Sequence, residues 1–120
     1  MKTPTLYIVN SFSINMLSNI LSDGKSHSIT FHPIQPWKLE CLIMSDKINV
    51  VNAIGHADTA YIVAKQFELD GISLPEAQRI NVNVGESDNL IVAQYIGPRL
   101  PEGCTKLPEG AEIKYFSVEF

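Results

Sequence analysis

The sequence is poor in the residues that build disulfide frameworks and metal centres. Its 120 residues include two cysteines, Cys41 and Cys104, and three histidines, and neither cysteine has a CxxC partner. These residues are too scattered for the ligand spacing of a zinc site, and no cluster of aspartates suits a magnesium ion. We therefore expect two ordinary thiols, and chemistry that uses neither a metal nor another cofactor.

Long apolar runs and an excess of positive charge are also missing. No apolar stretch approaches the ~20 residues of a membrane span, and the first residues lack the apolar core of a secretory signal. The formal net charge of −4 argues against a general nucleic-acid binder, which needs a basic face. We expect a soluble cytoplasmic protein with neither DNA nor a membrane as its partner. If the source is viral, the location is the host cell cytoplasm.

The length and the hydrophobic pattern predict one small α/β domain over residues 1–120. A chain of this size, with 45% hydrophobic and 18% charged residues, can bury one core. We expect a mixed sheet of about five strands with flanking helices, in which 80–84 and 90–96 form a hairpin. The expected strands are 6–9, 27–34, 48–51, 80–84, 90–96 and 111–120, and the expected helices are a short one capped by Ser13, one within 37–46 and one over 57–69.

A histidine stands where an apolar run gives way to the longest expected helix. The spacing of apolar residues predicts an amphipathic helix from Ala57 to Leu69, and His56 directly precedes it. Unpaired N–H groups and the helix dipole attract anions at such a junction, and a histidine there can donate a proton. A second junction of this kind follows the first expected strand, at Asn10 to Ser13. Two such corners predict a site for a small anionic ligand.

Each of these residues also has an interpretation without chemistry. His56 can simply cap its helix or pack, Gly55 can make a tight turn, and Asn10 can satisfy backbone groups at a strand end. Arg99 and Glu102 can be solvated side chains of the segment 97–110, which is long for a connection in so small a domain. Long ordered loops are often lids or binding elements.

Three blocks of sequence stand in a characteristic order along the chain. They are Asn10-x-Phe12-Ser13-Ile14-Asn15-Met16-Leu17, Asn52-x-Ile54-Gly55-His56-x-x-Thr59 and Arg99-Leu100-x-Glu102-Gly103. Together they resemble the viral ring nuclease family, the type III anti-CRISPR proteins, which is related to bacterial ring nucleases of the same domain family. The resemblance implies a homodimer that binds cyclic tetra-adenylate between its subunits and cuts it to linear di-adenylates without metal. This removes a signal of type III CRISPR defence.

The resemblance also implies roles for individual residues. His56 falls on the catalytic general acid, Glu102 on its helper, and Arg99 on a residue that stabilises charge at the phosphate. A neighbouring 2′-hydroxyl would attack phosphorus, so that the first product carries a 2′,3′-cyclic phosphate. Seven further residues are expected to bind the ligand: Asn10, Ser11, Ser13, Asn15, Gly55, Arg79 and Gln94.

Two functions of other classes remain open at this point. A protein that sequesters a cyclic nucleotide and releases it unchanged would need the same pocket but not His56. A structural or regulatory interaction protein would use both corners only to bind backbone or a partner chain.

Overall fold

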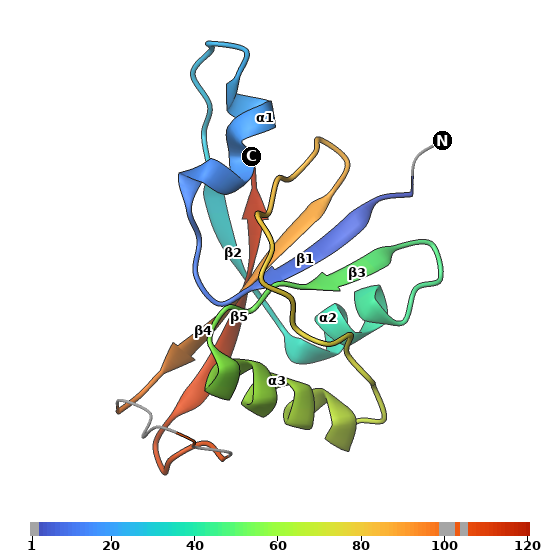
Figure 1. Ribbon diagram of the computed structural model, residues 1–120, viewed down its shortest axis with the longest axis vertical. Helices are drawn as coiled ribbons and strands as arrows, with labels where there is room; N and C mark the ends of the chain where they lie inside the picture. Colours follow the sequence, from blue (N-terminus) through green and yellow to red (C-terminus); the bar gives the residue numbers. More distant parts are fainter. Residues whose placement is uncertain (1–2, 99–102, 104–105) are drawn as a thin grey trace.

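A mixed five-stranded sheet is the frame of the protein, as the sequence predicted (Figure 1). It is seen in a computed structural model that describes residues 3–98, 103 and 106–120. The strand order is β2-β5-β4-β1-β3. The strands are β1 (Thr5–Val9), β2 (Thr30–Ile34), β3 (Asn49–Asn52), β4 (Asn89–Ile96) and β5 (Glu112–Glu119), and the helices are the 3₁₀ helix η1 (Ile14–Leu17), α1 (Ser18–Leu21), α2 (Pro36–Ile43) and α3 (Ala57–Leu69).

Strand β1 lies between two parallel neighbours. It pairs with β3 on one side and with β4 on the other, and both pairings are parallel. The rest of the sheet is antiparallel, with β4 paired to β5 and β5 to β2. The carboxyl ends of β1, β3 and β4 therefore meet at one edge of the sheet.

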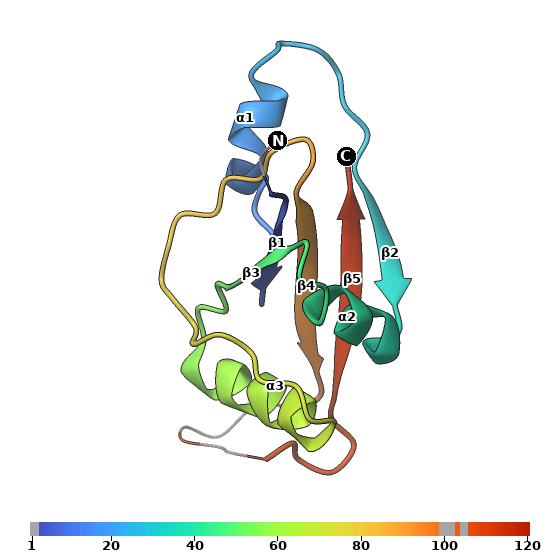
Figure 2. The same cartoon turned by 90° about the vertical axis from the view of Figure 1, so that its right-hand side faces the viewer.

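The sheet is covered on both faces, because successive residues of a strand point to opposite sides. Helices α2 and α3 pack on one face, where Leu39, Val63 and Phe67 join Leu6 and Ile8 of β1 in one cluster. On the other face Leu17 packs in a second cluster that includes Val9 and Val92 of the sheet. Figure 2 shows α2 and α3 together near one end of the sheet and α1 near the other.

The predicted hairpin of 80–84 with 90–96 is wrong. Residues 80–84 form no strand, because β4 already has β1 and β5 as its two neighbours. The alternation in this segment has another cause: Val82 and Val84 are buried in the cluster around Leu17, and the N–H of Val84 donates to the carbonyl of Met16 at 2.8 Å. Burial therefore alternates from residue to residue in 80–84 although this segment pairs with none of the strands of the sheet.

The remaining elements follow the prediction with smaller changes. The helix expected over 57–69 has these bounds, and the helix expected within 37–46 is α2, which begins one residue earlier, at Pro36. The strand expected over 27–34 begins only at Thr30. Cys41 is an exposed free thiol, whereas Cys104 lies outside the described residues.

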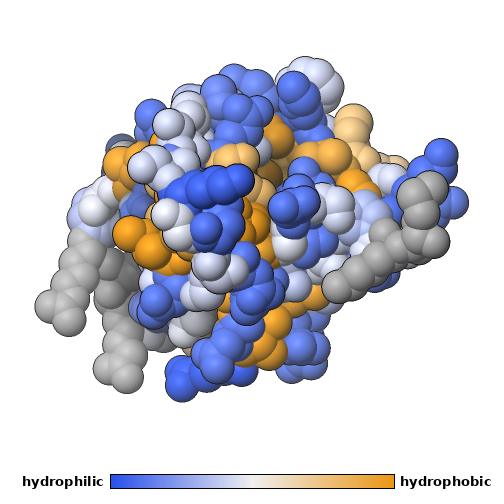
Figure 3. Space-filling model, turned by 90° about the horizontal axis from the view of Figure 1, so that it is seen from above, coloured by the Kyte–Doolittle hydropathy of each residue, from blue (hydrophilic) through white to orange (hydrophobic). Residues whose placement is uncertain are grey.

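The surface at the α1 end is largely hydrophilic, with smaller hydrophobic areas between the polar residues (Figure 3). Among the described residues, no helix combines the length and the apolar character that crossing a membrane requires.

Replacement of Asp70 by asparagine is expected to stabilise the protein at neutral pH. A hydrogen bond with Asp70 raises the pKa of the Glu40 carboxyl, with burial and charge repulsion adding to the effect. A raised carboxyl pKa favours folding at low pH, and this contribution is lost as pH rises through the folded-state value. Asp70→Asn removes the repulsion, and also a negative charge at the C-terminal end of α3. Its melting temperature should exceed that of the parent at pH 8 and match it at pH 4, whereas the exposed Asp46→Asn should change neither. An equal gain at both pH values would contradict this explanation.

Candidate functional site

The two corners predicted from the sequence follow adjacent parallel strands and leave the sheet on opposite faces. After β1 the chain passes into η1, whose Leu17 packs on one face, and after β3 it passes into α3 on the other. In open α/β sheets, the crevice at such a switch point, outside the carboxyl ends of the strands, is where ligands bind. The topology therefore creates a candidate site between the two corners.

A side chain of the first corner is bonded to the backbone of the second. The Oδ1 atom of Asn10 accepts the N–H of Gly55 at 2.9 Å, across 45 residues of sequence. Asn10 is half-buried and Gly55 is exposed. The interpretation that Asn10 satisfies backbone groups is thus confirmed, and the bond fixes the corners relative to each other.

His56 is the N-cap of α3, which confirms the capping interpretation. Its Nδ1 atom accepts the backbone N–H of Thr59 at 3.2 Å, and the hydroxyl of Thr59 lies 3.0 Å from the same nitrogen. The residue is exposed, and its Nε2 atom has no hydrogen-bond partner among the described residues. Capping therefore uses one ring nitrogen and leaves the other available for a ligand.

The first turn of α3 has further free donors beside His56. The N–H groups of Ala57 and Asp58 precede the first intrahelical bond, and within the described part of the chain nothing accepts from them. The carboxylate of Asp58 accepts the N–H of Gly103 at 3.1 Å, which places Gly103 beside this turn. Arg99 and Glu102, which were predicted to act here, lie outside the described residues.

The polar residues of the first corner build the start of η1. Ser13 is its N-cap, and its hydroxyl accepts the N–H of Asn15 at 3.4 Å. The carbonyl of Asn15 accepts the hydroxyl of Ser18 at 2.6 Å. Ser11, Ser13 and Asn15 are all exposed, so their remaining polar atoms face solvent at the rim of the crevice.

A buried asparagine ties the second corner to the chain segment that carries Arg79. The side chain of Asn52 donates to the carbonyl of Pro75 at 3.1 Å and accepts the N–H of Ile54 at 3.3 Å. Its own carbonyl accepts the N–H of Gln78 at 2.8 Å, which places the exposed Arg79 next to the end of β3. Asn52 and Thr59 were not among the predicted site residues, although both stand in the motif around His56. The signal in the sequence was a polar residue at a position where the apolar pattern predicts burial.

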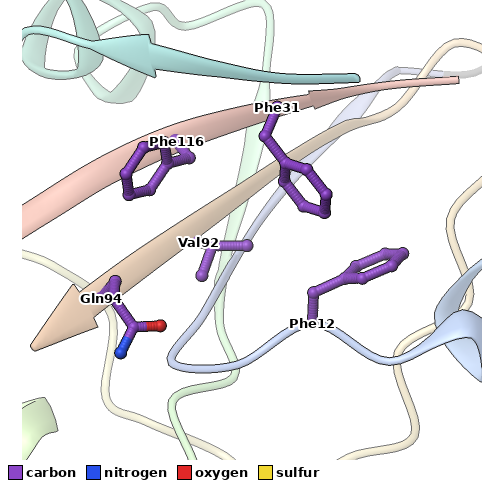
Figure 4. A pocket seen from close by; sticks show the side chains of 5 residues that line it. All are labelled: Phe12, Phe31, Val92, Gln94 and Phe116. Atoms are coloured by element: carbon purple, nitrogen blue, oxygen red, sulfur yellow. The ribbon is translucent and has the colours of Figure 1, made fainter. Parts of the chain in front are cut away.

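A cavity of about 310 Å³ opens beside the first corner, on the sheet face opposite α3 (Figure 4). Gln94 lines it and lies on β4 two residues beyond Val92, which pairs with Val9 at the end of β1. The amide nitrogen of Gln94 donates to the carbonyl of Tyr95 at 3.0 Å, while its oxygen has no partner in the described part of the protein. The other lining residues are apolar, namely Phe12, Phe31, Val92 and Phe116, and the rings of Phe12 and Phe31 meet edge to face with centroids 5.5 Å apart.

The structure thus brings most of the predicted residues to one edge of the sheet. Asn10 is bonded to Gly55, which directly precedes His56 in the chain. At the first corner lie Ser11, Ser13 and Asn15, and Gln94 lines the cavity beside it. Over the residues that are described, no group of three or more His, Cys, Asp or Glu side chains is arranged to hold a metal ion.

Fold and site define a small α/β domain with a mixed five-stranded sheet, in which two strand-to-helix corners join beside a capping histidine. The chain belongs to the STIV B116-like family, whose model matches residues 6–120. Among solved structures it is similar to B116 of Sulfolobus turreted icosahedral virus, with 29% sequence identity and a TM-score of 0.65. That match covers 95% of this chain and 97% of the viral protein. No curated protein matches the sequence.

Proposed function

We propose that this protein is a metal-independent ring nuclease that binds cyclic tetra-adenylate across a homodimer interface and cleaves it to linear di-adenylates. Its effect would be to switch off type III CRISPR signalling. The observation that carries the proposal is the bond from Gly55 to Asn10, which joins the two corners beside an exposed histidine nitrogen. These residues belong to the blocks that resemble viral ring nucleases.

The crevice suits a phosphodiester. Donors for its oxygens are available in the unpaired N–H groups of Ala57 and Asp58 and in the positive end of the α3 dipole. His56 directly precedes these groups, is exposed, and has no hydrogen-bond partner for Nε2 in the described part of the chain. A phosphate held at this helix terminus would therefore lie within reach of a proton donor.

The reaction follows from these groups. The 2′-hydroxyl of the ribose attacks the adjacent phosphorus and loses its proton to solvent, the O2′–P bond forms, and the P–O5′ bond breaks. His56 gives its proton to the departing 5′-oxygen. Glu102 acts as the helper of His56, the role that the resemblance implies for it. The product carries a 2′,3′-cyclic phosphate, and attack of a water molecule on phosphorus then opens it to a phosphate monoester and a free hydroxyl. Holding the ribose in line contributes most of the acceleration, and the proton transfer contributes on the order of 10²- to 10⁴-fold.

The cavity beside the first corner suits an adenine base. Aromatic side chains such as Phe12 and Phe31 favour stacking with a flat ring, and the amide of Gln94 can donate to and accept from an adenine edge. Asn10 lies between this cavity and His56, because it precedes Phe12 in the chain and bonds to Gly55. One nucleotide could then place its base in the cavity and its phosphate at α3.

The ring of the proposed substrate explains why a homodimer is needed. A two-fold axis places one copy of His56 on each side of a four-membered ring, so that two opposite bonds are cut and two equal halves leave.

The decisive experiment is to incubate the purified protein with cyclic oligoadenylates of different ring size in excess chelator and to identify products by mass spectrometry. Linear di-adenylate from the four-membered ring is the expected product. Cleavage that needs added magnesium would contradict metal independence. A thermal shift without cleavage would favour the sequestering protein, because a ligand that binds the native state must stabilise it. Neither a shift nor a product would favour an interaction protein.

Replacement of Gly55 by alanine should impair cleavage without harming the fold. The φ angle of Gly55 is not positive, and an added Cβ would meet only Asn10 Oδ1 at 3.8 Å, an ordinary contact. The fold thus has no need of glycine here, but a ligand that approaches the backbone does. We expect a loss of 10-fold or more, by order of magnitude, in the apparent affinity for cyclic tetra-adenylate, corresponding to about 1.4 kcal/mol.

The matched control is Gly97→Ala. Gly97 has a φ of 150°, and an added Cβ would lie 2.6 Å from the Cβ of Ala111, so this substitution should lower the free energy of unfolding by about 1–3 kcal/mol. Thermal denaturation of both variants, with binding measured by calorimetry, separates the two effects. Full affinity in Gly55→Ala would remove this corner from the binding site.

A further inference from the structure

A buried threonine has both of its hydrogen-bonding groups directed at the histidine of the site. Thr59 lies in the first turn of α3 and is only 5% exposed. Its backbone nitrogen is 3.2 Å from His56 Nδ1, and its hydroxyl oxygen is 3.0 Å from the same atom. Within the described residues, the hydroxyl of Thr59 has no other partner. This buried polar side chain therefore interacts with His56 alone.

The backbone bond decides where the resting histidine carries its proton. A peptide N–H can only donate, so the Nδ1 atom that it contacts must be the acceptor. A neutral imidazole carries one proton, which then resides on Nε2. In the other tautomer, Nδ1–H would face the N–H of Thr59, donor against donor, and one orphan donor of the helix terminus would lose its cap.

The hydroxyl of Thr59 can hydrogen-bond to the protonated ring of His56, which the backbone N–H of Thr59 cannot do. To protonate a leaving group with Nε2, His56 must first be an imidazolium, which carries protons on both nitrogens. A hydroxyl oxygen can accept from Nδ1–H, whereas the backbone N–H cannot and gives up its bond to Nδ1 while that nitrogen is protonated. Once Nε2 has given its proton to the 5′-oxygen, the neutral ring still carries the Nδ1 proton, and the same acceptor holds it. Exchange with solvent then restores the resting tautomer.

We propose that Thr59 is the positioning residue of His56. Its N–H fixes the resting tautomer with the proton on Nε2, and its hydroxyl reverses from donor to acceptor when the ring is protonated, so that the ring keeps one orientation through the cycle. The tautomer follows from the protein alone, and the kinetic consequence rests on the proposed function.

The tautomer is tested on the free protein by nitrogen NMR of histidine side chains, at a pH where the imidazoles are neutral. The signals of His56 are assigned by their absence from His56→Asn. The expected result is a protonated Nε2 and an unprotonated Nδ1. A protonated Nδ1 would overturn the first part of the proposal, whether or not the protein cleaves any substrate.

The hydroxyl is tested by two substitutions of similar volume. Thr59→Val removes it and keeps the backbone N–H, and Thr59→Ser keeps both. Cleavage by the valine variant should fall about 3- to 10-fold in kcat, the size of one hydrogen bond, with KM unchanged. The kcat of the serine variant should stay within about 2-fold of the parental value. The control Thr30→Val, at the exposed start of β2, should have the kcat of the parent.

The outcomes separate the possible failures. A valine variant as active as the parent would show that the hydroxyl does not position the ring. Equal losses of kcat in the valine and serine variants would assign Thr59 a packing role only. A parent protein without any cleavage would contradict the proposed function, and the NMR result would still decide the tautomer.

Discussion

Replacement of His56 by alanine is expected to slow cleavage of cyclic tetra-adenylate by 10²- to 10⁴-fold, the usual contribution of a general acid. The physical reason is that an alkoxide is a poor leaving group unless a proton reaches the 5′-oxygen as the P–O5′ bond breaks. His56 Nε2 is exposed at the crevice and has no competing partner among the described residues. Single-turnover kinetics measures this step apart from product release.

The alanine variant alone is ambiguous, because His56 also caps α3. Loss of a side-chain cap costs about 1 kcal/mol and could move the first turn of the helix. His56→Asn resolves this: asparagine is among the best N-cap residues, and its side-chain oxygen can accept the N–H of Thr59, but it supplies no acid. We expect His56→Asn to melt near the parent and to remain as slow as His56→Ala.

His32 provides the matched histidine control. It lies on β2, is exposed, and pairs with Glu119 at 2.9 Å. His32→Ala should cleave at the parental rate. If His56→Asn cleaves as fast as the parent while remaining folded, the role of general acid is wrong and a sequestering or binding function gains support.

The sequence predicted those helices and strands in which the spacing of apolar residues matches the side that is buried. The helix over 57–69 shows apolar residues three and four apart, and its apolar face packs on the sheet through Val63 and Phe67. The strands around 6–9 and 90–93 are apolar runs covered on both faces, whereas Gln94 and Ile96 at the end of β4 are exposed. For these elements pattern and burial agree, so the sequence predicts them nearly to the residue.

The segment 80–84 shows where such patterns fail. Its alternation of asparagine and valine is typical of a strand, and Val82 and Val84 are indeed buried while Asn81 and Asn83 are exposed. Period two reports burial on one side and not the presence of a pairing partner. Residues 80–84 do not pair with β4 because β1 and β5 occupy both of its sides. β1 is far from β4 in the sequence, so the local pattern could not predict this.

The candidate site, too, could be predicted from the sequence only in part. The two corners could be predicted, because each is a strand end followed by a polar turn and a helix start. Their joining through Asn10 and Gly55 could not, since it depends on β1 and β3 being adjacent and parallel. The contact of Thr59 with His56 also needed the helix geometry, which brings residues three apart to one side.

Replacement of Asn52 by alanine is expected to lower the free energy of unfolding by about 2–4 kcal/mol, more than the Gly97→Ala substitution does. Asn52 is 3% exposed, and its side chain both donates to Pro75 O and accepts from the N–H of Ile54. Truncation leaves the buried N–H of Ile54 without its acceptor, which costs about 1–3 kcal/mol, whereas the carbonyl of the exposed Pro75 can bond to water. The lost volume adds a cavity.

Asn49→Ala is the matched control, because Asn49 lies on the same strand and is exposed. Its free energy of unfolding in urea should change by less than about 0.5 kcal/mol. In Asn52→Ala, hydrogen exchange should also accelerate first at the amide of Ile54, which bonds to the Asn52 side chain, and less at Gln78, which bonds to the backbone carbonyl of residue 52. Such local loosening separates the corner before His56 from the segment that carries Arg79, so activity should fall more than the folded fraction explains. Equal stabilities of the two variants would mean that water replaces the Asn52 side chain, and that the corner does not depend on it.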